Sequence, residues 1–126
     1  MGERERGSAV VEFVLVMVVL VPLVLGIAQV GLVLHVRNTL TAAASDGARA
    51  AAPLGATPSD GIERTRQLIS GALADQYADD VTATFTTIGG VPATEVVVRA
   101  EVPALGILGP SVELTATGHA VQEVEP

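Results

Sequence analysis

Glu12 is the residue whose type and position point most clearly to chemistry. It is followed directly by Phe13 and a long apolar run, so its carboxylate lies in or near hydrocarbon if that run crosses a membrane. Insertion scales put the cost of a charged side chain at mid-membrane at roughly 2.5–3.5 kcal/mol unless the charge finds a partner. Two interpretations follow. Glu12 has a partner that compensates its charge, or it lies at the interface near Arg6 and reaches water.

Other residue types that support catalysis or metal binding are few and scattered. No motif links His35, near the end of the apolar run, or His119, on the expected solvent face of a strand, to a serine or an acid. Asp75, Asp79 and Asp80 form a local acidic cluster, but their spacing lacks the alternating ligands and closing glutamate of a calcium-binding loop. We therefore predict no catalytic residue, no metal site, no cofactor and no small-molecule substrate.

The composition narrows the function classes further. Hydrophobic residues make up 49% of the chain but aromatic residues only 2%, which suits a membrane helix with a thin sheet. The absence of cysteine excludes a disulfide framework, a thiolate metal site and a cysteine nucleophile. The formal charge is −7, there is no lysine, and the arginines are scattered. Because phosphate contacts need a basic face, the sequence predicts no nucleic-acid partner.

The apolar run from Val14 to Leu34 predicts a membrane-spanning helix. Only Gln29 is strongly polar in it, and its twenty-one residues cover roughly 30 Å at a rise of about 1.5 Å each. A cleaved secretory signal is the rival interpretation, but it requires an apolar region of only about 7–15 residues with a small-residue cleavage site close behind. Here the A-x-A-like stretch is 48–52, more than a helical turn past the end of the run. Pro22 is compatible with a bent membrane helix.

The charges that flank this run nearly balance. Arg4 and Arg6 precede it, and Arg37 and Arg49 follow it, so the positive-inside rule gives no clear orientation. The short N-terminal tail is the easier part to leave in the cytoplasm. We therefore expect a single-pass cell-membrane protein with a cytoplasmic N-terminus and an extracytoplasmic C-terminal domain.

A short motif opens the apolar helix: a charged leader, Gly7, four residues, then Glu12 and Phe13. It resembles the processing site of type IV prepilins, in which a membrane aspartic peptidase cuts after the glycine. The resemblance implies a cut between Gly7 and Ser8, which makes Glu12 the fifth mature residue and Phe13 the sixth. Glycine does not obstruct a peptidase, and the charged leader keeps the scissile bond at the cytoplasmic surface. The resemblance further implies that Glu12 pairs with the freed amine of a neighbouring subunit.

The first 52 residues as a whole resemble the TadE-like family, small pseudopilins of tight-adherence (Flp/Tad) pilus systems. The resemblance rests on the segment 6–16 (RGSAVVEFVLV), on Pro22-Leu23 and Gly26, and on the run 42–52 (AAASDGARAAA). The sequence departs from many members at Val30-Gly31-Leu32, where they carry aromatic-Gly-Arg. The resemblance implies that membrane lipid, a prepilin peptidase, other pilins and pilus assembly proteins are the partners.

We divide the chain into a leader peptide (1–7), a transmembrane and extended helix (8–52) and an extracytoplasmic α+β domain (53–126). The alanine-rich run after Leu34 favours helix, and Pro53 disfavours helix at the residue before it. Small residues recur there every four positions and form smooth stripes that a partner helix or the protein's own sheet could fill, although alanine also simply favours helix. The stripes are Ala43, Gly47 and Ala51, and Ala44, Ala48 and Ala52.

The outer domain reads as one helix followed by three strands. Thr57 as N-cap, Pro58 at the first helical position and Asp60 at the third predict a helix that runs to about Tyr77 with one apolar face on a sheet. Runs rich in Val and Thr, punctuated by Gly and Pro, predict the strands Val81–Ile88, Thr94–Val102 and Val112–Gln122.

Two features of these strands carry further expectations. Alternation predicts that one face of each later strand is buried, namely Val96, Val98, Ala100 and Val102, and Val112, Leu114, Ala116, Gly118 and Ala120. The apolar loop Pro103–Pro110 is either a contact surface or part of the core. The predicted fold class is α+β: a long N-terminal transmembrane helix that continues into a pilin-like domain with a second helix and a three-stranded antiparallel sheet.

These features predict a structural subunit and no enzyme. The leading hypothesis is a TadE-like minor pilin or pseudopilin that takes part in Tad (Flp) pilus assembly, with Gly7 and Ser8 as processing site and Glu12 and Phe13 as assembly residues. The alternative is a monomeric membrane-anchored binding module that enters no pilus, and cleavage after Gly7 would separate the two. A released enzyme would have to lose the N-terminal helix, and the outer domain offers no nucleophile–base pair.

Overall fold

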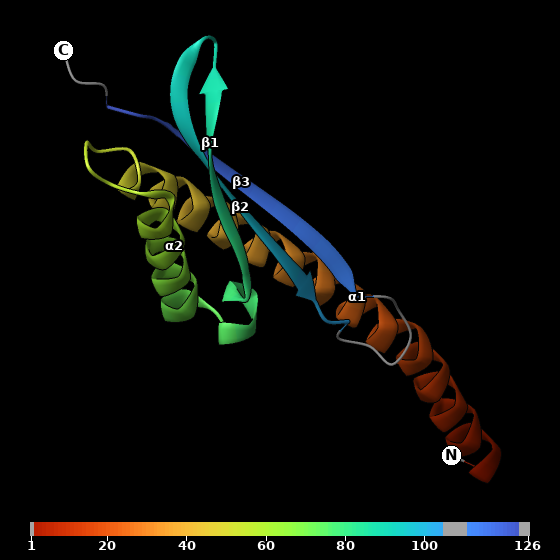
Figure 1. The fold of residues 1–126 in the computed structure, drawn as a ribbon. Helices are drawn as coiled ribbons and strands as arrows, with labels where there is room; N and C mark the ends of the chain where they lie inside the picture. The colour runs from red at the N-terminus through yellow and green to blue at the C-terminus, as the bar shows by residue number, and fades with distance from the viewer. Residues whose placement is uncertain (1, 105–110, 124–126) are drawn as a thin grey trace.

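The computed structural model describes residues 2–104 and 111–123 and shows a long helix with a small α+β head at its C-terminal end (Figure 1). Helix α1 runs Glu3–Ala50, helix α2 runs Pro58–Ala72, and a 3₁₀ turn, η1, covers Asp75–Ala78. Strands β1 (Asp80–Ile88), β2 (Val91–Val102) and β3 (Val112–Val121) follow. This architecture confirms the predicted fold class.

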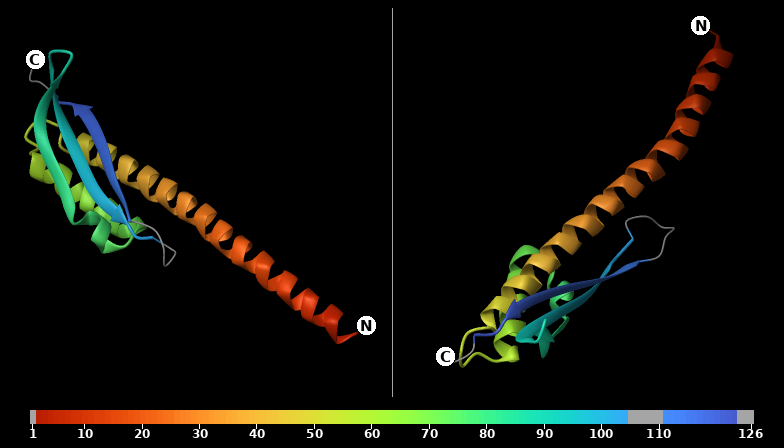
Figure 2. Two further views of the ribbon diagram at one scale, coloured as in Figure 1. Left: turned by 90° about the vertical axis from the view of Figure 1, so that its right-hand side faces the viewer. Right: turned by 90° about the horizontal axis from the view of Figure 1, so that it is seen from above.

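Helix α1 has two parts with different surroundings. Its N-terminal part projects alone, while its C-terminal part lies against the sheet and α2 (Figure 2). The helix continues through Pro22 and is capped by Ala51, two residues before Pro53. The predicted end at Ala52 is therefore right to within two residues, which is the usual uncertainty of a helix end.

The three strands form an antiparallel meander in the order β1-β2-β3. Gly89 and Gly90 both have positive φ angles, 56° and 83°, as a tight two-residue hairpin turn requires. This turn pairs Ile88 directly with Val91. Strand β2 therefore begins three residues before the predicted Thr94, because the hairpin forces the residues next to the turn into register.

The core lies between one face of the sheet and the two helices. Val36 and Leu40 of α1, Ile69 of α2, and Val96 and Val98 of β2 are fully buried there. The residues predicted to face the core from β2 and β3 are indeed those turned toward the helices, while Glu95, Arg99 and Glu101 face the other way. Burial of these apolar side chains at roughly 25 cal/mol per Å² is the main force holding the head to α1.

The small-residue stripes of α1 are filled from within the same chain. Ala43, Ala44, Gly47, Ala48 and Ala51 are all buried. An added β-carbon at Gly118 of β3 would stand 2.5 Å from the carbonyl oxygen of Ala44, and one at Gly61 of α2 would stand 2.9 Å from that of Gly47. The sequence left open whether a partner helix or the protein's own sheet packs on these stripes. In the structure, the protein's own sheet and α2 pack on them.

The predicted extent of α2 is wrong at its C-terminal end. The helix begins as expected, with the Thr57 N–H donating to the Asp60 carboxylate at 2.7 Å and Pro58 in first position. It stops at Ala72, and Leu73 is extended. Tyr77 instead lies in η1, where it is buried in the core. The chain must reverse there to bring β1 onto the sheet, and this tertiary requirement overrides the apolar spacing. Most of the predicted apolar loop, 105–110, lies outside the described residues.

Candidate functional site

The four predicted processing and assembly residues all lie on the projecting part of α1. A β-carbon added to Gly7 would meet nothing within 4 Å in the described structure, and Phe13 is 62% exposed. Ser8 and Glu12 are also exposed. The described part of the head therefore leaves this segment uncovered.

Ser8 and Glu12 are one helical turn apart. Positions i and i+4 lie on the same face of a helix, so Glu12 follows Ser8 along one stripe of α1 while Phe13 points about 100° away. Within the described residues the Glu12 carboxylate has no hydrogen bond or ion pair. An amine from outside the chain could therefore reach it. The stripe therefore leaves this carboxylate open to a partner of opposite charge.

The proposed scissile bond lies inside a helix. Since α1 begins at Glu3, the leader and the mature helix are continuous, and the bond between Gly7 and Ser8 falls in the second turn. Peptidases generally bind their substrates extended, so cleavage at this bond would require this end of α1 to unwind. Gly7 weakens the helix locally by about 1 kcal/mol relative to alanine, which lowers the cost of unwinding at that point.

The projecting part of α1 is also the apolar part. Its large side chains from Val10 to Val30 are mostly between 38% and 69% exposed. The helix is long and apolar enough to cross a membrane by length and composition. Uncovered apolar surface of this extent fits a single-pass membrane anchor, because lipid would cover what the head leaves open.

Gln29 marks the point where the head meets α1. Its side-chain amide donates to the backbone carbonyl of Pro103 at 3.2 Å. Sequence reasoning noted Gln29 only as the polar exception in the apolar run. The position of Gln29 as a lone amide among apolar residues was the feature that could have predicted this contact, because a buried amide needs a hydrogen-bonding partner.

The residues considered for catalysis or metal binding do not converge. His35 is exposed on α1, and Asp75, Asp79 and Asp80 are all exposed. His119 lies on the solvent face of β3, as predicted, where its Nε2 stands 2.8 Å from a carboxylate oxygen of Glu95, its cross-strand neighbour. That pair was missed, because it depends on the strand register. Among the described residues, no group of three potential ligands could hold a metal ion.

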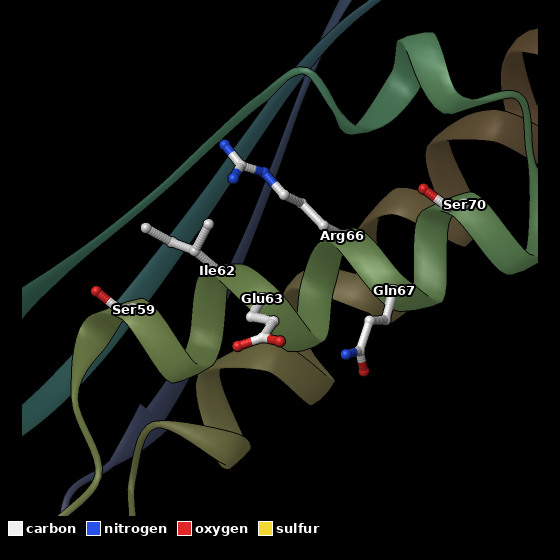
Figure 3. Close-up of a pocket in the computed structure, with 6 residues that line it drawn as sticks. All are labelled: Ser59, Ile62, Glu63, Arg66, Gln67 and Ser70. Atoms are coloured by element: carbon white, nitrogen blue, oxygen red, sulfur yellow. The ribbon is translucent and has the colours of Figure 1, made fainter.

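A groove of about 610 Å³ runs along the outer flank of α2, and all its lining residues come from that one helix. Figure 3 shows Ile62 and Arg66 pointing toward the strands while Glu63 and Gln67 point the other way. Side chains that diverge from one helix cannot surround a substrate. The lining residues are Ser59, Ile62, Glu63, Arg66, Gln67 and Ser70.

Comparison with known proteins finds a match for about a third of the chain, at its N-terminal end. Residues 7–49 match the family model of TadE-like proteins. No curated protein and no solved structure matches the chain. The match begins at Gly7 and ends one residue before the last residue of α1. It therefore covers the candidate processing site, the apolar segment and the part of α1 that carries the head. Over residues 7–49 this chain is similar to the TadE-like family, and the predicted resemblance is confirmed.

Proposed function

We propose that this protein is a minor pilin or pseudopilin of a Tad-type pilus system. A prepilin-type peptidase removes residues 1–7, and the mature chain is inserted with its N-terminus at the cytoplasmic face and its head outside. The protein then joins other pilus subunits through the projecting part of α1. The observation that carries this proposal is the arrangement of Gly7, Glu12 and Phe13 on an uncovered apolar helix, within a segment that matches the TadE-like family.

The geometry supports a role in assembly for Glu12. A carboxylate on an apolar helix is costly in lipid, and Glu12 has no partner within the described chain. Cleavage after Gly7 creates a new amine at Ser8 in every copy. A second subunit shifted along the helix axis would bring its amine to Glu12 and remove two unpaired charges together. The neighbouring apolar side chains, Phe13 among them, would then pack between helices.

The proposal is tested by the mass of the protein in cells with and without the cognate prepilin peptidase. Intact-mass spectrometry of membrane-extracted protein is expected to find a chain that starts at Ser8 only when the peptidase is active. Co-purification with other pilus components is then expected for the cut form. An uncut chain in the presence of active peptidase would favour a membrane-anchored binding module instead.

A further inference from the structure

Strand β1 has an unpaired edge. It is the first strand of the β1-β2-β3 sheet, and within residues 2–104 and 111–123 only β2 pairs with it. The pairing runs from Asp80 to Ile88 without a bulge, and residues 81–88 include no charge and no proline. Proteins usually protect an edge strand with a charge, a proline or a bulge. The edge of β1 is therefore open to a further strand.

The other edge strand, β3, differs in composition and contacts. It carries Glu113 and His119, and it rests on the α1 backbone at Gly118. Charged side chains are a usual protection of an edge strand against pairing. Of the two edges of the sheet, β1 is thus the one suited to a partner strand.

The backbone groups that face the open edge are identified by Pro92. The Pro92 carbonyl accepts a hydrogen bond from the Gln122 N–H at 2.9 Å, so it points toward β3. Thr87, the β1 partner of Pro92, therefore forms no ladder bond with it and directs its own N–H and C=O away from β2. Because backbone direction alternates along a strand, Phe85 and Ala83 do the same.

Helix α2 provides a surface beneath a strand added at this edge. From the groove on its outer flank, Ile62 and Arg66 point toward the strands (Figure 3). They are one turn apart, about 6 Å, which is close to the roughly 6.8 Å between alternate residues of a strand. Among the described residues the Arg66 guanidinium has no hydrogen bond or ion pair. An apolar side chain and a carboxylate on one face of the added strand would match these two residues.

We propose that the edge of β1 and the outer flank of α2 bind an extended segment of a different protein, which adds a fourth strand to the sheet and directs an acidic side chain toward Arg66. The backbone groups of Ala83, Phe85 and Thr87 hold the segment. Phe85 is 61% exposed on the helix-facing side of β1, so its ring is available to a side chain of the added strand. Backbone pairing supplies affinity, and Arg66 supplies selectivity for an acidic segment.

A second copy of the chain does not suit this edge. Two identical strands that pair antiparallel are related by a twofold axis normal to the sheet. Since α1 lies along the sheet, this axis would turn the α1 of the second copy in the opposite direction (Figure 2). The two N-termini could not then lie on the same side of one membrane. This exclusion rests on the membrane anchoring in the proposed function.

A synthetic peptide can test the edge directly. The probe has nine residues, like β1, with threonine and valine alternating and one valine replaced by aspartate. Fluorescence anisotropy of the labelled peptide measures its binding to the detergent-solubilised full chain. Thr87→Pro removes an outward N–H but no ladder bond to β2, and it is expected to weaken binding by about tenfold. Thr87→Val keeps the N–H and is the matched control.

Equal binding by Thr87→Pro and Thr87→Val would overturn the pairing at β1, and so would failure of the natural chain to bind the peptide. The thermal unfolding midpoint of each variant shows whether it is folded. Arg66→Gln is the second variant, because an exposed side chain can be changed without disturbing the core. It is expected to weaken binding of the aspartate peptide about fivefold and to leave binding of an asparagine peptide unchanged. Equal effects on the two peptides would overturn the role of Arg66.

Thr84→Cys separates a second copy from a different partner. Thr84 is the middle residue of β1 and would face its own copy in a fully overlapping antiparallel pair, and the natural chain contains no cysteine. In oxidised membranes of cells without other pilus proteins, no disulfide-linked dimer is expected. A dimer would assign the edge to a second copy and overturn the proposal. None of these results bears on the mass of the processed chain, so the proposed function is tested separately.

Discussion

Gly47 of α1 and Thr65 of α2 are in such close contact that no side chain fits between them. A β-carbon at position 47 would overlap the Thr65 hydroxyl and would lie 2.7 Å from the carbonyl oxygen of Gly61. The hydroxyl is held in place, because it donates to that same carbonyl at 2.7 Å and is fully buried. The contact sets the distance between the two helices and therefore the position of α2 on the head.

Gly47→Ala is expected to destabilise the head by about 1–3 kcal/mol, because the added methyl must displace a buried hydrogen bond or push α2 away. The thermal unfolding midpoint of the detergent-solubilised full chain measures this loss. Gly71→Ala is the matched control, since a β-carbon there meets nothing within 4 Å in the described structure and the helix gains propensity. Equal midpoints for the two variants would contradict the close contact.

Gly118→Ala is expected to be at least as damaging as Gly47→Ala. The added β-carbon would stand 2.5 Å from the carbonyl oxygen of Ala44 and would also overlap the backbone of Ser45. Backbone atoms in the middle of a helix cannot rotate away, so β3 would have to lift from α1. Faster limited proteolysis of the head, together with a lower unfolding midpoint, would report the separation.

The control for Gly118 is its neighbour Thr117, which is exposed on the other face of β3. Thr117→Ala loses only some strand propensity, less than about 1 kcal/mol. If Gly118→Ala resists protease as well as Thr117→Ala, then β3 does not rest on the α1 backbone.

Gly7→Val is expected to abolish cleavage of the leader while leaving membrane insertion unchanged. A branched side chain at the scissile position obstructs the peptidase and stiffens the chain locally. The measurement is the intact mass of membrane-extracted protein from cells with active peptidase. Gly2→Val is the control, because it places the same side chain in the leader, where it also meets nothing within 4 Å, and should be processed normally. Normal processing of Gly7→Val would rule out a cut after this glycine.

Glu12→Gln is expected to be inserted and cut normally but to associate poorly with other pilus subunits. Loss of one partner of a desolvated ion pair costs on the order of 3–5 kcal/mol, which lowers association by more than a hundredfold. Quantitative co-purification with other pilus components measures the effect. Glu5→Gln is the control. It makes the same change in the leader, which the peptidase removes, so the mature chain is unaltered. An effect of twofold or less relative to Glu5→Gln would argue that Glu12 merely reaches water at the interface.

The local sequence was enough to predict the features that depend on neighbours along the chain. The apolar and alanine-rich composition predicts one long helix to Ala52, two residues past its observed end. Thr57 with Asp60 marks the start of α2, and Gly89-Gly90 marks the hairpin. The alternation in β2 identifies its buried face. These signals are local because helix caps, tight turns and strand faces are set by residues only two to four positions apart.

The tertiary structure alone decided which surfaces meet. From the sequence alone, the alanine stripes suit a partner helix and the protein's own sheet equally well. The structure places Gly118 of β3 and Gly61 of α2 against them. Hydropathy counts only the side chains of the helix itself. Which of those side chains the head covers depends on Pro103, which lies 74 positions after Gln29 in the chain, and only folding brings the two together.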